Sequence, residues 1–231
     1  MGNKEYDKWH LEKGEYNDDT TIWHQFSKES LEKNDLISTK ILEIGCGRGG
    51  FSAFLANESD ESTEIYACDY SEKALEIAKE RFKIGYEKIN WKVEDIQNIS
   101  FQSNQFDVVI SCETIEHVPN PIKALGELHR VLKPGGKLIL TCPNYFNLFG
   151  IWCLYRWIIG KPFTEGGQPY VNYILIPRIF MRLKSLKFKV NHFHSAELII
   201  PARVPKTFYR TKLPKFLSFM GYRTFYVLTK K

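Results

Sequence analysis

The stretch that most constrains the fold is I-L-E-I-G-C-G-R-G-G at Ile41–Gly50, where apolar residues run directly into a cluster of glycines. An apolar run at helical spacing follows at Phe51–Ala56. This order predicts a strand, a tight turn and a helix. The glycines permit positive φ angles and let a ligand approach the main chain, while the start of the helix offers free N–H groups. We call residues 45–50 the glycine loop and expect a ligand there.

The glycines alone leave two classes of ligand open. Gly45, Gly47 and Gly50 fit the G-x-G-x-x-G of dinucleotide-binding enzymes, which makes an NAD-dependent oxidoreductase one alternative. Asp69 stands near the distance expected for its ribose contact. However, Glu43 ends the first expected strand and gives the pattern E-x-G-x-G-x-G. An acid there suits an amino or sulfonium group and would repel the pyrophosphate of NAD.

Acidic residues also end the next two expected strands. The second strand ends in Asp69, which can accept hydrogen bonds from both ribose hydroxyls of an adenosine, and Tyr70 can cover the adenine. The third is followed by Asp95, placed for the adenine amino group, and by Ile96, which can pack on the ring. Carboxylates at three successive strand ends, beside the glycine loop, indicate an adenosyl ligand that carries no phosphate.

On these residues the chain resembles class I S-adenosylmethionine (SAM)-dependent methyltransferases. The resemblance covers roughly Ile41–Pro143, where F-D-V-V-I-S-C-E-T-I-E-H-V-P-N-P and R-V-L-K-P-G-G-K-L-I-L-T are similar to later motifs of small-molecule and ubiquinone-type O-methyltransferases. It implies SAM as cofactor, S-adenosylhomocysteine as product, and an oxygen or nitrogen of a secondary metabolite, sugar or quinone-like acceptor as methyl acceptor. The cofactor-binding residues expected are Glu43, Gly45, Cys46, Gly47, Gly49, Asp69, Tyr70, Asp95, Ile96 and Cys112.

The order of expected elements, β-α-β-α-β-α-β-α-β, predicts an α/β, Rossmann-like, doubly wound sheet with its ligand crevice at the carboxyl ends of the strands. The resemblance implies seven mostly parallel strands, with the last, Thr224–Thr229, antiparallel. Residues 201–214 are expected to be irregular. The expected division is an N-terminal lid at 1–35, a SAM-binding core at 36–143, an aromatic cap insertion for the acceptor after strand five at 144–176, and the C-terminal part of the core sheet at 177–231.

Aromatic side chains mark the two segments expected to cover the site. The resemblance implies that the N-terminal segment folds over cofactor and acceptor, or it simply packs a helix at 21–31 on the core. Its aromatic residues are Tyr6, Trp9, Tyr16, Trp23, His24 and Phe26. The run at Tyr145–Ile159 can line an apolar acceptor pocket, lie on a bilayer surface with the help of Arg156 and Lys161, or pack against its own core or a second copy.

Methyl transfer from a sulfonium requires close contact between acceptor and methyl group and a base that removes a proton. His117 is the first candidate for the catalytic base, because it follows the fourth strand and its imidazole titrates near neutrality. His194 and His192, at the end of a later strand, are the next candidates.

The pattern Glu113-x-x-Glu116-His117 has a second interpretation. On a short helix these three side chains would share one side, and two carboxylates with an imidazole suit Mg²⁺. It resembles the E-x-x-E-H that holds a metal in small-RNA 2′-O-methyltransferases and some quinone O-methyltransferases. The RNA enzymes add a His soon after the fifth strand, and residues 144–177 contain none. We therefore expect no metal, and keep RNA methylation and a non-catalytic SAM-binding protein as alternatives.

Charge and hydrophobicity are consistent with one enzyme domain. The 231 residues are 43% hydrophobic, which is ample for a single core, and the net charge is +5. Basic residues gather in the C-terminal half, where acids are nearly absent. That asymmetry suits an acidic acceptor, a lipid headgroup or nucleic acid, with nucleic acid the least favoured, or it is an ordinary solvated surface. We expect a monomer or homodimer.

The five cysteines show no C-x-x-C spacing. Cys68, Cys112 and Cys142 each end an expected parallel strand, so we expect buried thiols along a sheet edge rather than disulfides. Met1–His10 is polar and charged and does not resemble a signal peptide. These features together predict a cytoplasmic protein.

Overall fold

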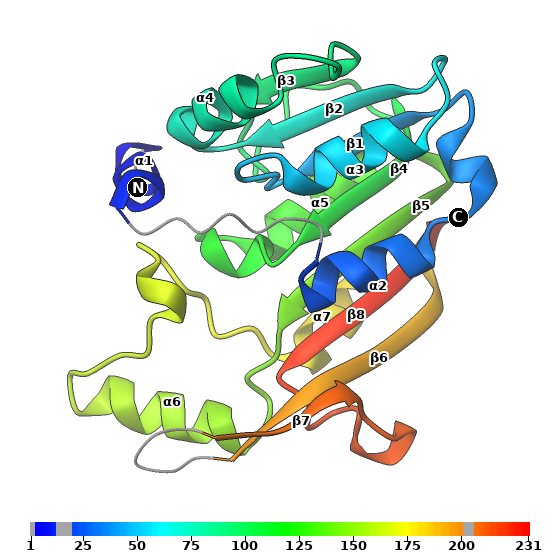
Figure 1. The fold of residues 1–231 in the computed structure, drawn as a ribbon. Coiled ribbons are helices and arrows are strands. Elements are labelled where there is room, and N and C mark those ends of the chain that lie inside the picture. The colour runs from blue at the N-terminus through cyan, green and yellow to red at the C-terminus, as the bar shows by residue number, and fades with distance from the viewer. Residues whose placement is uncertain (1–2, 13–19, 201–205) are drawn as a thin grey trace.

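The computed structural model describes residues 3–12, 20–200 and 206–231, and Figure 1 shows one twisted sheet with helices packed on it. Tyr16 of the expected lid lies outside the described residues. The strands are β1 Lys40–Ile44, β2 Glu64–Asp69, β3 Ile89–Val93, β4 Phe106–Cys112, β5 Leu132–Pro143, β6 Phe188–Ile200, β7 Lys206–Lys212 and β8 Arg223–Lys230.

The described strands form an eight-stranded sheet in the order β3-β2-β1-β4-β5-β8-β6-β7. Strands β1 to β5 pair in parallel, and β8 runs antiparallel to both of its neighbours. This confirms the predicted fold class, with its reversed last strand. Strand β7 is an addition at the edge, paired with the end of β6. The expectation that residues 201–214 are irregular was therefore wrong for 206–212, where the unpaired edge of β6 supplies hydrogen-bond partners.

Helices cover both faces of the sheet. They are α1 Asn3–Glu12, α2 Ile22–Ser30, α3 Gly50–Glu58, α4 Glu72–Arg81, α5 Pro121–Val131, α6 Leu148–Ile158 and α7 Ile176–Ser185, with 3₁₀ turns η1 Lys33–Leu36, η2 Ile115–His117, η3 Glu165–Gly167 and η4 Lys215–Leu217. Their starts agree with ordinary capping chemistry: the side chain of Thr21 caps α2, that of Ser71 caps α4, and that of Asn120 caps α5.

Side chains alternate between two apolar layers along the central strands. On one face, Ile41 and Val108 pack with residues of α2, α3 and α4; on the other, Leu42 and Val109 pack with residues of α5 and α7. This alternation follows from the two-residue period of a strand. Because both faces are covered, the polar chemistry concentrates at the ends of the strands.

All five cysteines are free thiols, as predicted. Cys68 and Cys142 are fully buried within the sheet. Among the described residues, none of the helices has the length and apolar character needed to cross a membrane.

Two glycines of the glycine loop are required by packing as well as by backbone conformation. Gly45 has φ +83°, and a Cβ there would stand 2.1 Å from Thr114 Oγ1. Gly49 has φ +77° and caps α3, and its Cβ would stand 2.4 Å from the Trp91 ring. The loop therefore passes between the side chains of neighbouring strand ends with no space left at these two positions.

We predict that Gly49→Ala destabilises the protein well beyond the cost of its backbone angle. Gly85 is the matched control, since it has φ +83° and no described atom lies within 4 Å of the position that its Cβ would take. Gly85→Ala should cost about 1 kcal/mol of unfolding free energy for the left-handed angle, while Gly49→Ala should cost about 1–3 kcal/mol more for the overlap with Trp91. Urea unfolding measures both values, and equal costs would contradict the packing argument.

Candidate functional site

A cavity of about 460 Å³ opens at the carboxyl ends of the central strands, within the range of small-molecule sites. In Figure 1 the arrowhead of β2 points toward this side, where α1 lies. Nine of the eleven predicted site residues line the cavity: Gly45, Cys46, Gly47, Asp69, Tyr70, Asp95, Ile96, Cys112 and His117. The fold therefore brings together residues that are up to 72 positions apart in the sequence.

The carboxylate of Asp69 fixes the glycine loop against the second strand. Gly47 N donates to Asp69 Oδ2 at 2.8 Å, and Ser71 N donates to Oδ1 at 2.9 Å. Gly45 N also donates to Cys68 O at 2.8 Å. In the described part of the chain, nothing lies within 4 Å of the position that a Cβ on Gly47 would take. The main chain at Gly47 is thus open to a ligand, while Asp69 keeps free lone pairs toward the cavity.

Glu43 and Gly49 are the two predicted site residues that are not among the lining residues. Glu43 is only 4% exposed and accepts a hydrogen bond from Ser52 Oγ of α3. Burial raises the pKa of Glu43 to about 8, so its carboxyl group is neutral at pH 7 in this structure. Glu43 therefore lies in the protein interior, behind the residues that line the cavity. Its expected contact with a cationic ligand group stays a prediction.

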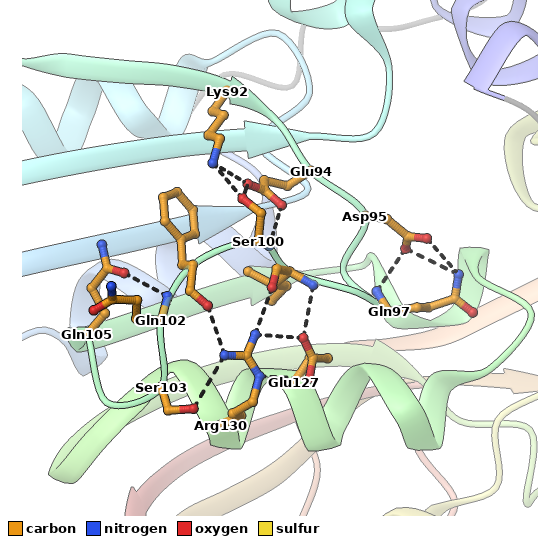
Figure 2. A network of polar contacts seen from close by, with 12 residues as sticks. Lys92, Glu94, Asp95, Gln97, Ser100, Gln102, Ser103, Gln105, Glu127 and Arg130 are labelled. Atoms are coloured by element: carbon orange, nitrogen blue, oxygen red, sulfur yellow. Dashed lines mark hydrogen bonds and ion pairs between the residues drawn. The ribbon is translucent and has the colours of Figure 1, made fainter.

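Asp95 and Ile96 lie on the loop after β3, which a polar network holds in place (Figure 2). Gln97 N donates to Asp95 Oδ1 at 2.8 Å, which turns the chain at that point. The buried carboxylate of Glu94 accepts from Ser100 N and pairs with Lys92, each at 2.8 Å. These contacts fix the loop to the edge of the sheet.

The far end of the same loop is held by α5. Arg130 donates to the carbonyl oxygens of Ile99 at 2.7 Å and Phe101 at 2.8 Å, and Figure 2 shows its guanidinium beside Glu127. Glu127 in turn accepts from Ile99 N at 2.9 Å. Asp95 therefore stands on a loop whose backbone groups are satisfied from both sides, which keeps the cavity wall in one shape.

Helix α1 lies across the cavity and contacts both of its walls. Tyr6 Oη donates to His117 O at 2.6 Å, and Trp9 Nε1 donates to Gly166 O at 3.1 Å. At the other wall, Asp7 Oδ1 accepts from Ser71 Oγ at 2.7 Å and from Lys73 N at 3.1 Å. This geometry agrees with the expected lid, whose closing function remains a prediction.

The other aromatic residues of the N-terminal segment divide between two positions. Trp23 and His24 of α2 line the cavity. Phe26 is 6% exposed and packs in the core beneath α2, so the helix expected at residues 21–31 serves the core as well as the site.

The imidazole of His117, which lines the cavity, is held in one orientation. Its Nδ1 lies 2.9 Å from Tyr170 O, so Nδ1 carries the proton and Nε2 is left as an acceptor. Burial lowers the pKa of His117, which favours the neutral ring. His192 and His194, the alternative bases, pack on Phe26 and are not among the lining residues.

The E-x-x-E-H segment does not form the helical ligand set that its spacing suggested. Glu113 has φ +48° and precedes the 3₁₀ turn, so it does not share a helix face with Glu116 and His117. Its carboxylate pairs instead with Arg223 of β8. Arg223 also contacts Glu197 at 2.8 Å and Glu165 at 3.6 Å.

Glu116 is fully buried, and neither of its carboxylate oxygens has a hydrogen-bond partner among the described residues. Burial, together with the nearby Glu113 and Glu165, raises the pKa of Glu116 well above its usual range. One oxygen lies 3.6 Å from His117 Nε2. Glu116, His117 and Glu165 could hold a metal, because each offers a ligand atom within 4.8 Å of the others.

Sequence reasoning missed Arg223 and Glu165, which both line the cavity. A signal for Arg223 was available, since it is the one charged residue at the start of the otherwise apolar strand T-F-Y-V-L. Glu165 is the one acid between residues 144 and 196. An isolated acid in a basic segment is a reason to expect a specific partner.

Comparisons with known proteins agree with this geometry. Residues 42–140 match the family described as a methyltransferase domain. A demethylmenaquinone methyltransferase from Staphylococcus epidermidis is 28% identical over 158 residues, which are 64% of this chain and 64% of that protein. The chain thus spans less than two thirds of the length of this relative.

Solved structures extend the likeness to nearly the whole chain. A SAM-dependent methyltransferase from Thermotoga maritima has a TM-score of 0.62 and 20% identity, covering 99% of this chain and 96% of that one. One from Methanosarcina mazei has a TM-score of 0.64 and 20% identity, covering 88% and 96%. Residues 42–140 therefore form a methyltransferase domain, and the chain has the fold of the SAM-dependent methyltransferases.

Proposed function

We propose that this protein uses SAM to transfer a methyl group to an oxygen or nitrogen of a small-molecule acceptor. The observation that carries the proposal is that one cavity is lined both by the glycine loop with Asp69 and Asp95 and by His117. Among secondary-metabolite, sugar and quinone-like acceptors, the quinone-like class has the additional support of the demethylmenaquinone methyltransferase relatives.

The cofactor wall fits an adenosyl ligand. Asp69 and Asp95 both line the cavity, and we infer that Asp69 accepts hydrogen bonds from ribose hydroxyls and Asp95 accepts one from the adenine amino group. Ile96 offers an apolar surface to the ring, with Tyr70 nearby at the same wall. The open main chain at Gly47 leaves room for the methionine end. When bound, SAM supplies an electrophilic methyl group on a sulfonium.

The acceptor wall would supply the base and exclude water. The neutral His117 ring is fixed by Tyr170 O, so Nε2 can take the proton that the acceptor loses. Tyr6 and Trp9 of α1 close over this end of the cavity through their contacts with His117 O and Gly166 O. We propose that α1 is the lid, that residues 144–176 are the acceptor cap, and that the protein works in the cytoplasm.

We predict that Asp69→Ala weakens SAM binding about 100-fold or more, because it removes the ribose contacts and the hold on the glycine loop. Asp95→Asn should weaken it about tenfold, since one hydrogen bond to a charged group is worth about 1.5–3 kcal/mol. Glu61→Gln, at an exposed turn before β2, is the control and should have no effect. Isothermal titration measures the affinities, and circular dichroism checks the fold.

Unchanged SAM affinity in Asp69→Ala would contradict the proposed cofactor site. Titration with NAD separates the oxidoreductase alternative, because the unmodified protein should bind SAM and not NAD. Tight NAD binding without SAM binding would overturn the proposed function.

We predict that His117→Asn lowers kcat by about 10²–10⁴-fold while SAM affinity stays within about twofold. Asn can keep the donor to Tyr170 O but has no basic nitrogen. In the unmodified enzyme the base acts in its neutral form and its pKa is lowered, so the acid limb of kcat/KM should lie below the ordinary value of 6.5. Release of S-adenosylhomocysteine with hydroxylated quinols and amines gives the rates; a pH profile that keeps the same limb in His117→Asn would assign the base elsewhere.

We predict that a chelator such as EDTA leaves methyl transfer unchanged. Glu165, one of the three candidate ligands, already pairs with Arg223 at 3.6 Å, and Glu113 pairs with the same guanidinium, so these carboxylates have a cation within the protein. If Mg²⁺ or Mn²⁺ instead restored activity lost in EDTA, and Glu165→Gln abolished that rescue, the three groups would be a metal site and the prediction would be wrong.

A further inference from the structure

Helix α6 is apolar on its outer side as well as its inner side. Its inner side is buried: Phe149 is 2% exposed and Cys153 is 0% exposed, and Phe149 stacks against Tyr145 and packs edge-on against Tyr222 in a small separate core. The side chain of Asn147 caps its first turn by accepting from Gly150 N at 3.0 Å. The helix is thus firmly attached to the protein, and its outer side chains are held at the surface.

The outer side of α6 presents large apolar side chains to solvent. Each of these side chains is more than half exposed, although the large apolar side chains of an ordinary amphipathic helix in a globular protein are buried. A contiguous surface of this kind marks an interaction site. The residues, which we call the α6 face, are Leu148, Ile151, Leu154, Tyr155, Trp157 and Ile158.

A second exposed apolar group lies at the same end of the molecule. Phe216 is 82% exposed and Phe219 is 53% exposed, in the segment between β7 and β8. Figure 1 shows that segment, in orange-red, and α6 both at the lower end of the view. Two elements from distant parts of the sequence therefore turn apolar side chains outward at one end of the protein.

The charges of this half of the chain suit an anionic surface. Residues 144–231 contain fifteen Lys and Arg but two acids, Glu165 and Glu197. Both acids contact Arg223, which leaves fourteen other Lys and Arg residues in this half of the sequence. Next to the α6 face, Arg156 and Lys161 are the charged residues between positions 144 and 164. The two charged side chains of the segment that contains the face are therefore both basic.

We propose that the α6 face docks on an anionic lipid bilayer, with α6 lying in the plane of the headgroups. Apolar residues with Trp and Tyr, beside basic residues, are the composition of interfacial helices. Eleven residues at 1.5 Å each give about 16 Å, roughly half of a bilayer's hydrocarbon core, so α6 lies on the membrane rather than across it.

A second copy of the chain is a poorer occupant for this face. Two copies packed through α6 would bring Arg156 and Lys161 of each copy together, and like charges oppose such contacts. An anionic bilayer supplies the opposite charge as well as the apolar phase. The bilayer therefore satisfies both properties of the surface.

Docking in this way would place the cavity close to the lipid phase. The chain passes from the end of α6 at Ile158 to the cavity-lining residues Glu165 and Gly166 within eight positions. This part of the inference rests on the proposed function, because it requires that an acceptor of the quinone-like class enters the cavity from the bilayer. The docking itself does not depend on which acceptor is methylated.

The test is co-sedimentation of the full chain with vesicles of equal parts phosphatidylglycerol and phosphatidylcholine, against vesicles of phosphatidylcholine alone. We expect binding to the anionic vesicles that falls steeply between about 0.1 and 0.5 M NaCl, where the Debye length shortens. The double variant Ile151→Gln and Ile158→Gln should bind at least about tenfold more weakly. Ile84→Gln is the matched control: Ile84 is 79% exposed, lies between α4 and β3, and should bind as the unmodified protein does.

Thermal melts and SAM titration of the same variants separate docking from folding and from the proposed function. Unchanged melts and SAM affinity beside lost vesicle binding support the proposal. Equal weakening by Ile84→Gln, or no vesicle binding at any salt concentration, would overturn it. So would a dimer in sedimentation velocity that the double variant dissociates, or tight binding of a 20-nucleotide RNA without vesicle binding.

Discussion

The arrangement of the cavity depends on one carboxylate. Asp69 ends β2 and accepts hydrogen bonds from Gly47 N of the glycine loop and Ser71 N at the start of α4. This places the open backbone at Gly47, the acid itself and the first turn of α4 around one point. Both oxygens of Asp69 already accept a hydrogen bond from the protein, so the proposed cofactor contacts would use the remaining lone pairs.

Arg223 has the corresponding role at the opposite wall. Three carboxylates surround its guanidinium: Glu113 from the end of β4, Glu165 from the cap and Glu197 from β6. A buried charge of this kind is stable only because each partner is opposite in sign. Through the ion pair of Glu165 with Arg223, residues 144–176 are joined to the central sheet. Helix α6, within the same segment, is joined to the sheet by the small apolar core around Tyr145 and Tyr222.

The fold, and the meeting of most of the expected site residues at one cavity, could be predicted from the sequence because both depend on local patterns. Acids at strand ends, such as Asp69 and Asp95, meet at one edge of the sheet once the strands run parallel. The partnership of Glu113 with Arg223 spans 110 positions, and no local pattern announces it. The interpretation of E-x-x-E-H assumed a helical turn, and the positive φ of Glu113 changed where its carboxylate points.

The same difference between local patterns and long-range contacts explains which properties of this protein can be inferred from its relatives. The methyltransferase domain at 42–140 contains the cofactor wall, from the glycine loop to Asp95, together with His117. The cavity lining also includes residues outside that range, among them Trp9, Glu165 and Arg223. Similarity over the domain therefore supports a shared cofactor, while the acceptor must be inferred from side chains that converge only in the folded chain. The α6 face at residues 148–158 also lies outside residues 42–140, so similarity over the domain does not bear on the proposed docking.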